Sequence, residues 1–221
     1  MEKLFIFWAS WLYFPFAALC LFLLFQKRGV LTQAVTAGAL LLTSVLAYAR
    51  FIEPRILVSH HETIILPGAS ETSPSIRIAL FGDPHIGIFG NAMPISRIVG
   101  RINSEGVDAV FLAGDITYYP DEETIQTQIT ALKDLSVPAY AVLGNHDVGF
   151  PGPDLSNPVL SALDKANVQV PQNRALEEVI AGHRIIVAGA SDLWQHRQDF
   201  SFSADLPDGI PVILLTHNPD T

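Results

Sequence analysis

Four apolar runs in this chain each end at residues that can bind a metal ion. The runs are SIRIALFGDPH, DAVFLAGD, AYAVLGNHD and PVILLTH, and their polar ends are Asp83 and His85, Asp115, Asn145 and His146, and His217. In an open α/β sheet, the loops that leave the carboxyl ends of the strands meet in one crevice. We therefore expect an α/β fold that brings these distant residues together. Carboxylates, an amide and imidazoles suit divalent or trivalent ions better than thiol-seeking ones.

The segments between these runs are predicted to form helices. In ISRIVGRINSEG, apolar residues recur at positions 95, 98, 99 and 102, which predicts a helix with one buried face that ends near Gly106. DEETIQTQITALKDL repeats this pattern, and a third helix is expected over 158–166. ALEEVI and RIIVAGA then predict two strands joined at residues 181–183. This order predicts βαβ units followed by a mixed sheet or a second sheet.

The first 54 residues have the composition of a membrane anchor. Residues 4–25 carry no charged side chain, and residues 30–49 are nearly as apolar. About 20 apolar residues cross a hydrocarbon core as a helix, so two membrane helices are expected, preceding a soluble domain over 55–221. The alternatives are a single anchor, or a cleaved signal peptide followed by a buried helix. A signal peptide usually has a shorter apolar core and a basic amino end.

A cell-membrane location with two helices follows from this interpretation, and the side of the membrane stays open. An even number of spans places the amino end and the soluble domain on the same side. The turn between the helices holds Lys27 and Arg28, whereas the other side holds Lys3, Arg50 and Arg55. That balance of positive charge does not decide the orientation.

The soluble domain is strongly acidic. Beyond residue 55 the sequence has 20 acidic and 8 basic residues, a net charge of about −12. Phosphate backbones are held mainly by Lys and Arg, so no nucleic-acid-binding surface is expected. Cys20 is the only cysteine and lies in the first apolar run. One chain therefore forms no internal disulfide and no cysteine-based zinc site.

Each motif alone is a weak signal, whereas their joint occurrence is specific. The segments GDPHIG, LAGDITYY, LGNHD and LTHNPD, in this order and each after an apolar strand, resemble the calcineurin-like metallophosphoesterase family. The segment FIEPRILVSHHETIILP before SIRIALFGD resembles the membrane-anchored branch of that family. The resemblance covers residues 51–221. It implies a fold of β-sandwich-like mixed sheets flanked by helices.

The resemblance also implies a set of metal ligands. Asp83 and His85 would hold one ion, Asn145 and His217 would hold a second, and Asp115 would bridge the two. The implied cofactors are two divalent or trivalent ions, with manganese, iron and zinc as candidates. Two such cations can activate a water and stabilise a phosphoryl transition state. The implied reaction is hydrolysis of a phosphomonoester or phosphodiester through a metal-bound hydroxide.

His146 does not match a ligand position of the family. It resembles a general acid that protonates the leaving oxygen, with Asp147 as the partner that orients its ring. The alternative for Asp147 is a turn or capping residue. Trp194, in the segment GASDLWQH, is expected to pack over the edge of a sheet, and contact with the substrate is the alternative.

The family's last motif, G-H-x-H, is not found in the sequence, which stops at Thr221. We therefore expect a family domain that is incomplete at its carboxyl end. The leading interpretation is a membrane-anchored dimetal phosphoesterase whose partners are the bilayer and a phosphoester, with a lipid-linked phosphate as one candidate. The alternatives are a member of the fold without turnover and a membrane-associated binding module without metal.

Overall fold

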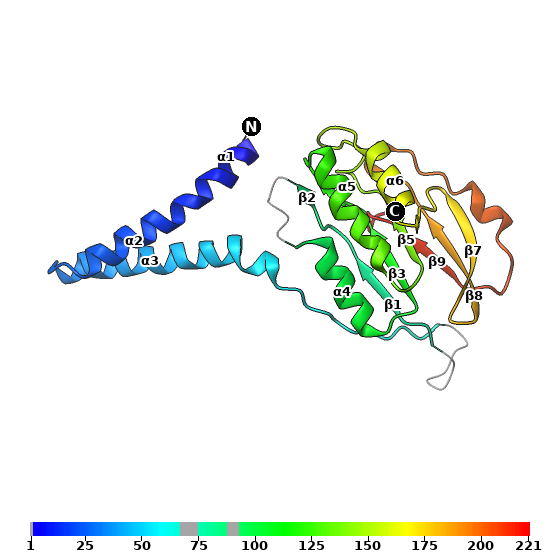
Figure 1. Ribbon diagram of the computed structural model, residues 1–221, viewed down its shortest axis with the longest axis horizontal. Helices are drawn as coiled ribbons and strands as arrows, with labels where there is room; N and C mark the ends of the chain where they lie inside the picture. The colour runs from blue at the N-terminus through cyan, green and yellow to red at the C-terminus, as the bar shows by residue number, and fades with distance from the viewer. Residues whose placement is uncertain (1, 67–74, 88–92) are drawn as a thin grey trace. The chain divides into compact units, whose positions relative to one another are not determined.

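The computed structural model describes residues 2–66, 75–87 and 93–221. Its contacts divide the chain into two compact units, Met1–Ser59 and His60–Thr221. Figure 1 labels the α-helices and most of the strands.

The amino-terminal unit consists of two apolar helical segments that pack against each other. The first comprises α1 (Glu2–Ala9), the 3₁₀ turn η1 (Ser10–Leu12) and α2 (Tyr13–Leu24), and the second is α3 (Val30–Phe51), followed by η2 (Glu53–Arg55). The hydroxyls of Thr36, Thr43 and Ser44 each donate to the carbonyl four residues earlier, at 2.8 Å. These bonds satisfy the polar groups within the helix itself. Phe5–Leu24 and Val30–Arg55 are long and apolar enough to cross a membrane.

The second unit is built on a parallel four-stranded sheet. Its strand order is β1 (Ile78–Phe81), β3 (Ala109–Ala113), β5 (Ala139–Val142) and β6 (Val168–Gln169). The crossovers between these strands are α4 (Ile95–Glu105), α5 (Glu122–Thr130) with η3 (Ala131–Asp134), and α6 (Ser156–Lys165). The helices expected at 95–106, 121–135 and 158–166 are therefore confirmed. The two-residue strand β6 was not anticipated, because so short a run leaves no alternation to detect.

Two layers cover the two faces of this sheet. Alternate residues of β3 face opposite sides: Val110 and Leu112 lie in the core under α4, α5 and α6, while Ala109 and Phe111 face a second sheet. Figure 1 shows the three helices together on one side of the parallel strands. Burial on both faces explains why the strand sequences are continuously apolar.

The second sheet contains β7 (Arg174–Ile180), β8 (His183–Gly189) and β9 (Val212–Leu215), where β7 and β8 are antiparallel and β8 and β9 are parallel. Between β8 and β9 lie the short 3₁₀ helices η4 (Leu193–Gln195) and η5 (Ser201–Asp205). A small parallel pair, β2 (Ile86–Gly87) and β4 (Thr117–Tyr118), follows the ends of β1 and β3. The expected mixed sheets flanked by helices are confirmed.

One detail differs from the expectation of a single crevice above one sheet. Three of the four motif-bearing strands, β1, β3 and β5, are neighbours in the parallel sheet, whereas β9 belongs to the second sheet. The two sheets pack through residues such as Tyr140 and Val187. His217 nevertheless reaches the end of β3, where its ring contacts Ala113 and Asp115.

Candidate metal centre

The loops after β1 and β3 are joined by backbone hydrogen bonds where the strands end. The N–H groups of Asp83 and His85 donate to the carbonyls of Gly114 and Asp115, at 3.0 and 3.2 Å. Asp83, His85 and Asp115 all have left-handed backbones, with φ of 54°, 45° and 49°. Such conformations are uncommon for residues other than glycine and cluster at functional sites.

Two glycines allow the loops after β3 and β5 to approach closely. A β-carbon on Gly114 would lie 2.6 Å from the backbone nitrogen of Gly144, and one on Gly144 would overlap Asp115 Oδ1. No side chain fits at either position without moving the loops apart. The two glycines therefore bring Asp115 against the LGNHD loop.

Asp115 lies at the middle of the cluster and is almost fully buried, with 4% of its surface exposed. Its Oδ1 accepts a hydrogen bond from the backbone N–H of His146 at 2.9 Å and lies 3.4 Å from His217 Nε2. Its Oδ2 lies 3.4 Å from His85 Nε2. Each oxygen thus faces a different imidazole, as a carboxylate shared between two ions requires. Burial raises the pKa of the Asp115 carboxyl, but the hydrogen bonds from His85 and the His146 backbone outweigh it and hold this pKa below its usual value.

The contacts of His217 and Asn145 determine which of their atoms are acceptors. His217 Nδ1 lies 2.8 Å from the carbonyl oxygen of Ala113, which only accepts, so Nδ1 carries the hydrogen. In the neutral ring, Nε2 then presents a lone pair. Asn145 Nδ2 donates to the carbonyl of Phe150 at 2.6 Å, which turns Oδ1 of this amide toward His217 Nε2, 3.1 Å away.

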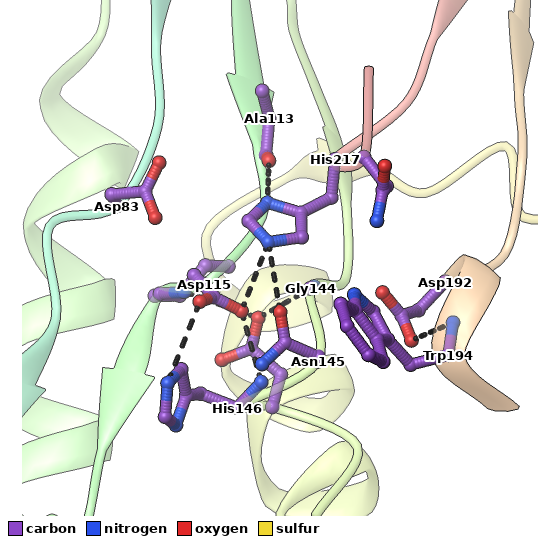
Figure 2. Close-up of polar contacts among 12 residues, drawn as sticks. Asp83, Ala113, Asp115, Gly144, Asn145, His146, Asp192, Trp194 and His217 are labelled. Atoms are coloured by element: carbon purple, nitrogen blue, oxygen red, sulfur yellow. Dashed lines mark hydrogen bonds and ion pairs between the residues drawn. The ribbon is translucent and has the colours of Figure 1, made fainter. Parts of the chain in front are cut away.

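Three atoms that can bind a metal ion therefore lie close together, since His217 Nε2 is 3.1 Å from Asn145 Oδ1 and 3.4 Å from Asp115 Oδ1 (Figure 2). When the His217 ring is neutral, its Nε2 is an acceptor like the two oxygens, and a proton or a metal cation among the three offsets their repulsion. An imidazole nitrogen, an amide oxygen and a carboxylate oxygen are the donors that manganese, iron or zinc accepts. The hydrogen bond from His217 to Ala113 is also the kind of contact that orients a metal-binding imidazole. The donor set thus fits a metal ion.

A second group of donors lies on the other side of Asp115. His85 Nε2 is 3.2 Å from Asp83 Oδ1 and 3.4 Å from Asp115 Oδ2. The hydrogen bond to Asp115 is the largest cause that raises the pKa of the His85 imidazole, although burial opposes it. A proton on Nε2 here occupies the place between two carboxylates that a metal cation would take.

The structure brings all five expected ligands together, in groupings that differ partly from the expected ones. The donor atoms of Asp83, Asp115 and His217 lie within 4.8 Å of one another, and so do those of His85, Asp115 and His146. Asp115 is common to both groups, as expected of a bridging residue. His146, which we expect to be a general acid, also lies within reach of a metal.

The His146 ring lies against other rings at the edge of this cluster. Its Nε2 is 3.9 Å from Asp115 Oδ2, and the side chain is 15% exposed. Tyr118 and His85 contact it edge to face, with ring centroids 4.7 and 5.1 Å away. The ring is thus held in place and keeps some access to solvent.

Asp147 has the position of the turn residue that was the alternative in the sequence analysis. It is fully buried, and its two oxygens accept four hydrogen bonds. The donors are the backbone N–H groups of Gly144, Ile116 and Thr117 and the hydroxyl of Thr117, at 2.7–3.1 Å. Burial raises the pKa of this carboxyl, and the four hydrogen bonds oppose that shift. Asp147 therefore fastens the LGNHD loop to the segment that follows Asp115.

Two further residues next to the centre were not singled out from the sequence. Asp192 is 4% exposed, and its Oδ1 has no hydrogen-bond partner among the described residues. Burial is the largest cause that raises the pKa of this carboxyl, and the hydrogen bond from the Trp194 N–H opposes that shift. Phe150 accepts the hydrogen bond of Asn145 and stacks on Trp194, which is 55% exposed rather than packed over a sheet edge.

Comparison with known proteins agrees with this geometry. A family model described as calcineurin-like phosphoesterase matches residues 76–221. The uncharacterized metallophosphoesterase YkuE of Bacillus subtilis (strain 168) is 28% identical over 192 residues, which cover 85% of this chain. The chain spans 66% of the length of that relative. The match covers all the strands that carry the candidate ligands, so the chain belongs to the calcineurin-like phosphoesterase family.

Proposed function

We propose that this protein is a membrane-anchored dimetal phosphoesterase that hydrolyses a phosphomonoester or phosphodiester. The observation that carries the proposal is the cluster of imidazole, amide and carboxylate atoms around buried Asp115. Membership in the calcineurin-like phosphoesterase family supports metal-dependent phosphoester chemistry.

The proposed ligands divide into two sets that share one residue. Asp83 and His85 would hold one ion, Asn145 and His217 would hold the other, and Asp115 would be shared between the two. This assignment agrees with the two sides of Asp115, where Oδ2 faces His85 and Oδ1 faces His217. Manganese, iron and zinc all suit these donors, so experiment has to identify the ions.

The remaining residues are assigned to proton transfer and positioning. Bound ions supply the positive charge that activates a water and stabilises the phosphoryl oxygens. His146 donates a proton to the leaving oxygen, because its ring lies beside the cluster and keeps access to solvent. Asp147 acts as a positioning residue, since its four hydrogen bonds hold the loop that carries Asn145 and His146.

Metal analysis combined with an activity assay tests the proposal. We expect about two transition-metal ions per purified full-length chain, and hydrolysis of 4-nitrophenyl phosphate or its bis-ester that a chelator abolishes. His217→Ala should lower the metal content, because it removes a nitrogen that faces both Asn145 and Asp115.

The matched control is His183→Ala, at the turn between β7 and β8, which should leave the metal content unchanged. A metal content near zero after incubation with manganese, iron and zinc would show that the cluster is not a metal centre. Metal without hydrolysis of either ester would contradict the enzymatic part of the proposal.

Two apolar helices support the membrane location. Phe5–Leu24 and Val30–Arg55 have 20 and 26 residues, enough to cross a hydrocarbon core of about 30 Å. A substrate at the lipid headgroups, such as a lipid-linked phosphate, fits this location, and a soluble phosphoester is the alternative.

We expect the protein to stay in the membrane pellet after alkaline carbonate extraction, since each helix buries its apolar surface in lipid. Intact-protein mass spectrometry of that fraction should find the sequence from residue 1 or 2 onward. A shorter mass that begins after the first apolar run would identify a cleaved signal peptide instead.

A further inference from the structure

Two aromatic rings lie half-exposed next to the candidate metal ligands. The surfaces of Phe150 and Trp194 are 49% and 55% exposed, and the rings stack with centroids 6.0 Å apart and planes 28° from parallel. Exposure on this scale leaves apolar surface of both rings in water. Burying such surface under a ligand is favourable.

The position of Phe150 is coupled to a proposed metal ligand. The side-chain amide of Asn145 donates to the Phe150 carbonyl at 2.6 Å, and the Phe150 N–H donates to the Asn145 carbonyl at 2.7 Å. The same amide that turns its oxygen toward His217 therefore also holds the backbone of Phe150. This ring lies where the LGNHD loop leaves the centre.

Trp194 belongs to the 3₁₀ turn η4, and hydrogen bonds hold this turn beside the loop that follows His146. Asp192 caps the 3₁₀ turn η4 by accepting the Trp194 N–H at 2.9 Å, and the side chain of Gln195 donates to the carbonyl of Val148 at 2.6 Å. The second bond ties η4 to the loop that follows His146. Figure 2 shows the indole of Trp194 between Asn145 and Asp192.

We infer that Phe150 and Trp194 form a platform that binds an uncharged apolar group of the substrate, namely the organic part esterified to the phosphoryl group. The inference rests on the proposed function, which places the phosphoryl group at the metal centre. The platform consists of two stacked ring faces. A leaving group with further phosphates would need Lys or Arg side chains, and this domain has 8 of these against 20 acidic residues.

The apolar group can be a planar ring or an alkyl chain, and both bury surface on an aromatic face. Binding of three phosphonates distinguishes a ring from an alkyl chain. Phosphonates keep the negatively charged phosphoryl-like group and are not hydrolysed. The probes are methylphosphonate, hexylphosphonate and 1-naphthylphosphonate, titrated calorimetrically into the manganese-loaded full-length protein. We expect one of the two larger probes to bind about 10-fold or more tightly than methylphosphonate. Preference for the naphthyl probe identifies a ring, and preference for the hexyl probe identifies a chain.

Phe150→Ala and Trp194→Ala should each remove most of that preference while leaving methylphosphonate binding within about threefold. Trp194→Phe should retain part of it, because a ring face remains. The matched control is Phe200→Ala. Phe200 is also an exposed aromatic residue, 39% exposed and paired with Phe202, and it precedes η5, which packs against β7.

Equal binding of all three probes by the wild type would show that Phe150 and Trp194 do not bind an apolar group, and it would not contradict the proposed function. Retention of the preference in both alanine variants would also refute the platform. If none of the probes binds the metal-loaded protein, the metal centre does not hold a phosphoryl-like group, and the proposed function fails together with the platform.

Discussion

Asp115→Asn is expected to lower both metal content and turnover more than any other single conservative substitution in the cluster. Asp115 faces His217 with one oxygen and His85 with the other. Asparagine keeps one ligand oxygen and replaces the second with an NH₂ group, which cannot bind a cation. We expect metal content to fall from about two ions to about one or fewer, and kcat/KM to fall by roughly 10² or more.

The fold should survive this change, because the amide oxygen can still accept the hydrogen bond from the His146 backbone. The matched control is Asp108→Asn, just before β3, where the carboxylate accepts the N–H of Arg77 at 2.8 Å. Elemental analysis, thermal melting and steady-state kinetics on both variants give the comparison. A variant at Asp115 that keeps two ions would show that this residue does not bridge them.

The convergence of the candidate ligands could be predicted from the sequence because the apolar runs of β1, β3 and β5 each end at a glycine and polar residues, which mark the end of a strand. The apolar run of β3 stops at Gly114 and Asp115, and the runs of β1 and β5 stop in the same way. Strand ends of neighbouring parallel strands meet at one edge, so the sequence order alone places Asp83, Asp115 and Asn145 together.

Contacts between distant segments could not be predicted in this way. Asp147 accepts hydrogen bonds from Ile116 and Thr117, about 30 residues earlier, and three of its four donors are backbone N–H groups. Every residue except proline carries a backbone N–H, so no residue pattern marks this contact. The sequence therefore leaves two roles open for Asp147, orienting His146 or holding a turn, and the folded loop uses its carboxylate to hold the backbone.

The contact between Phe150 and Trp194 could not be predicted from the sequence, for a related reason. Phe150 and Trp194 are 44 residues apart in the sequence and lie in irregular segments, so no helical or strand periodicity connects them. The two segments that carry them are also joined by the hydrogen bond from the Gln195 side chain to the carbonyl of Val148, which no residue pattern marks. The sequence also leaves open which sheet the strand before His217 joins, because an apolar run does not reveal its neighbours.

His146→Ala separates a general acid from a metal ligand, the two roles that the structure leaves to this ring. The alanine variant keeps the backbone N–H that donates to Asp115 Oδ1 at 2.9 Å, so the bridging carboxylate stays in place and only the imidazole is lost. If His146 is the acid, metal content should remain at about two ions while kcat falls by about 10² to 10⁴ on alkyl esters.

The size of that loss should depend on the leaving group. An alcohol departs as a poor leaving group and needs a proton, whereas 4-nitrophenolate does not, so the loss should shrink on 4-nitrophenyl esters. His60→Ala, an exposed histidine outside the cluster, provides the matched control. His146 lies with His85 and Asp115 in a group that could hold an ion, so loss of metal as complete as in Asp115→Asn would make His146 a ligand. Equal impairment on activated and unactivated esters would likewise exclude the role of proton donor.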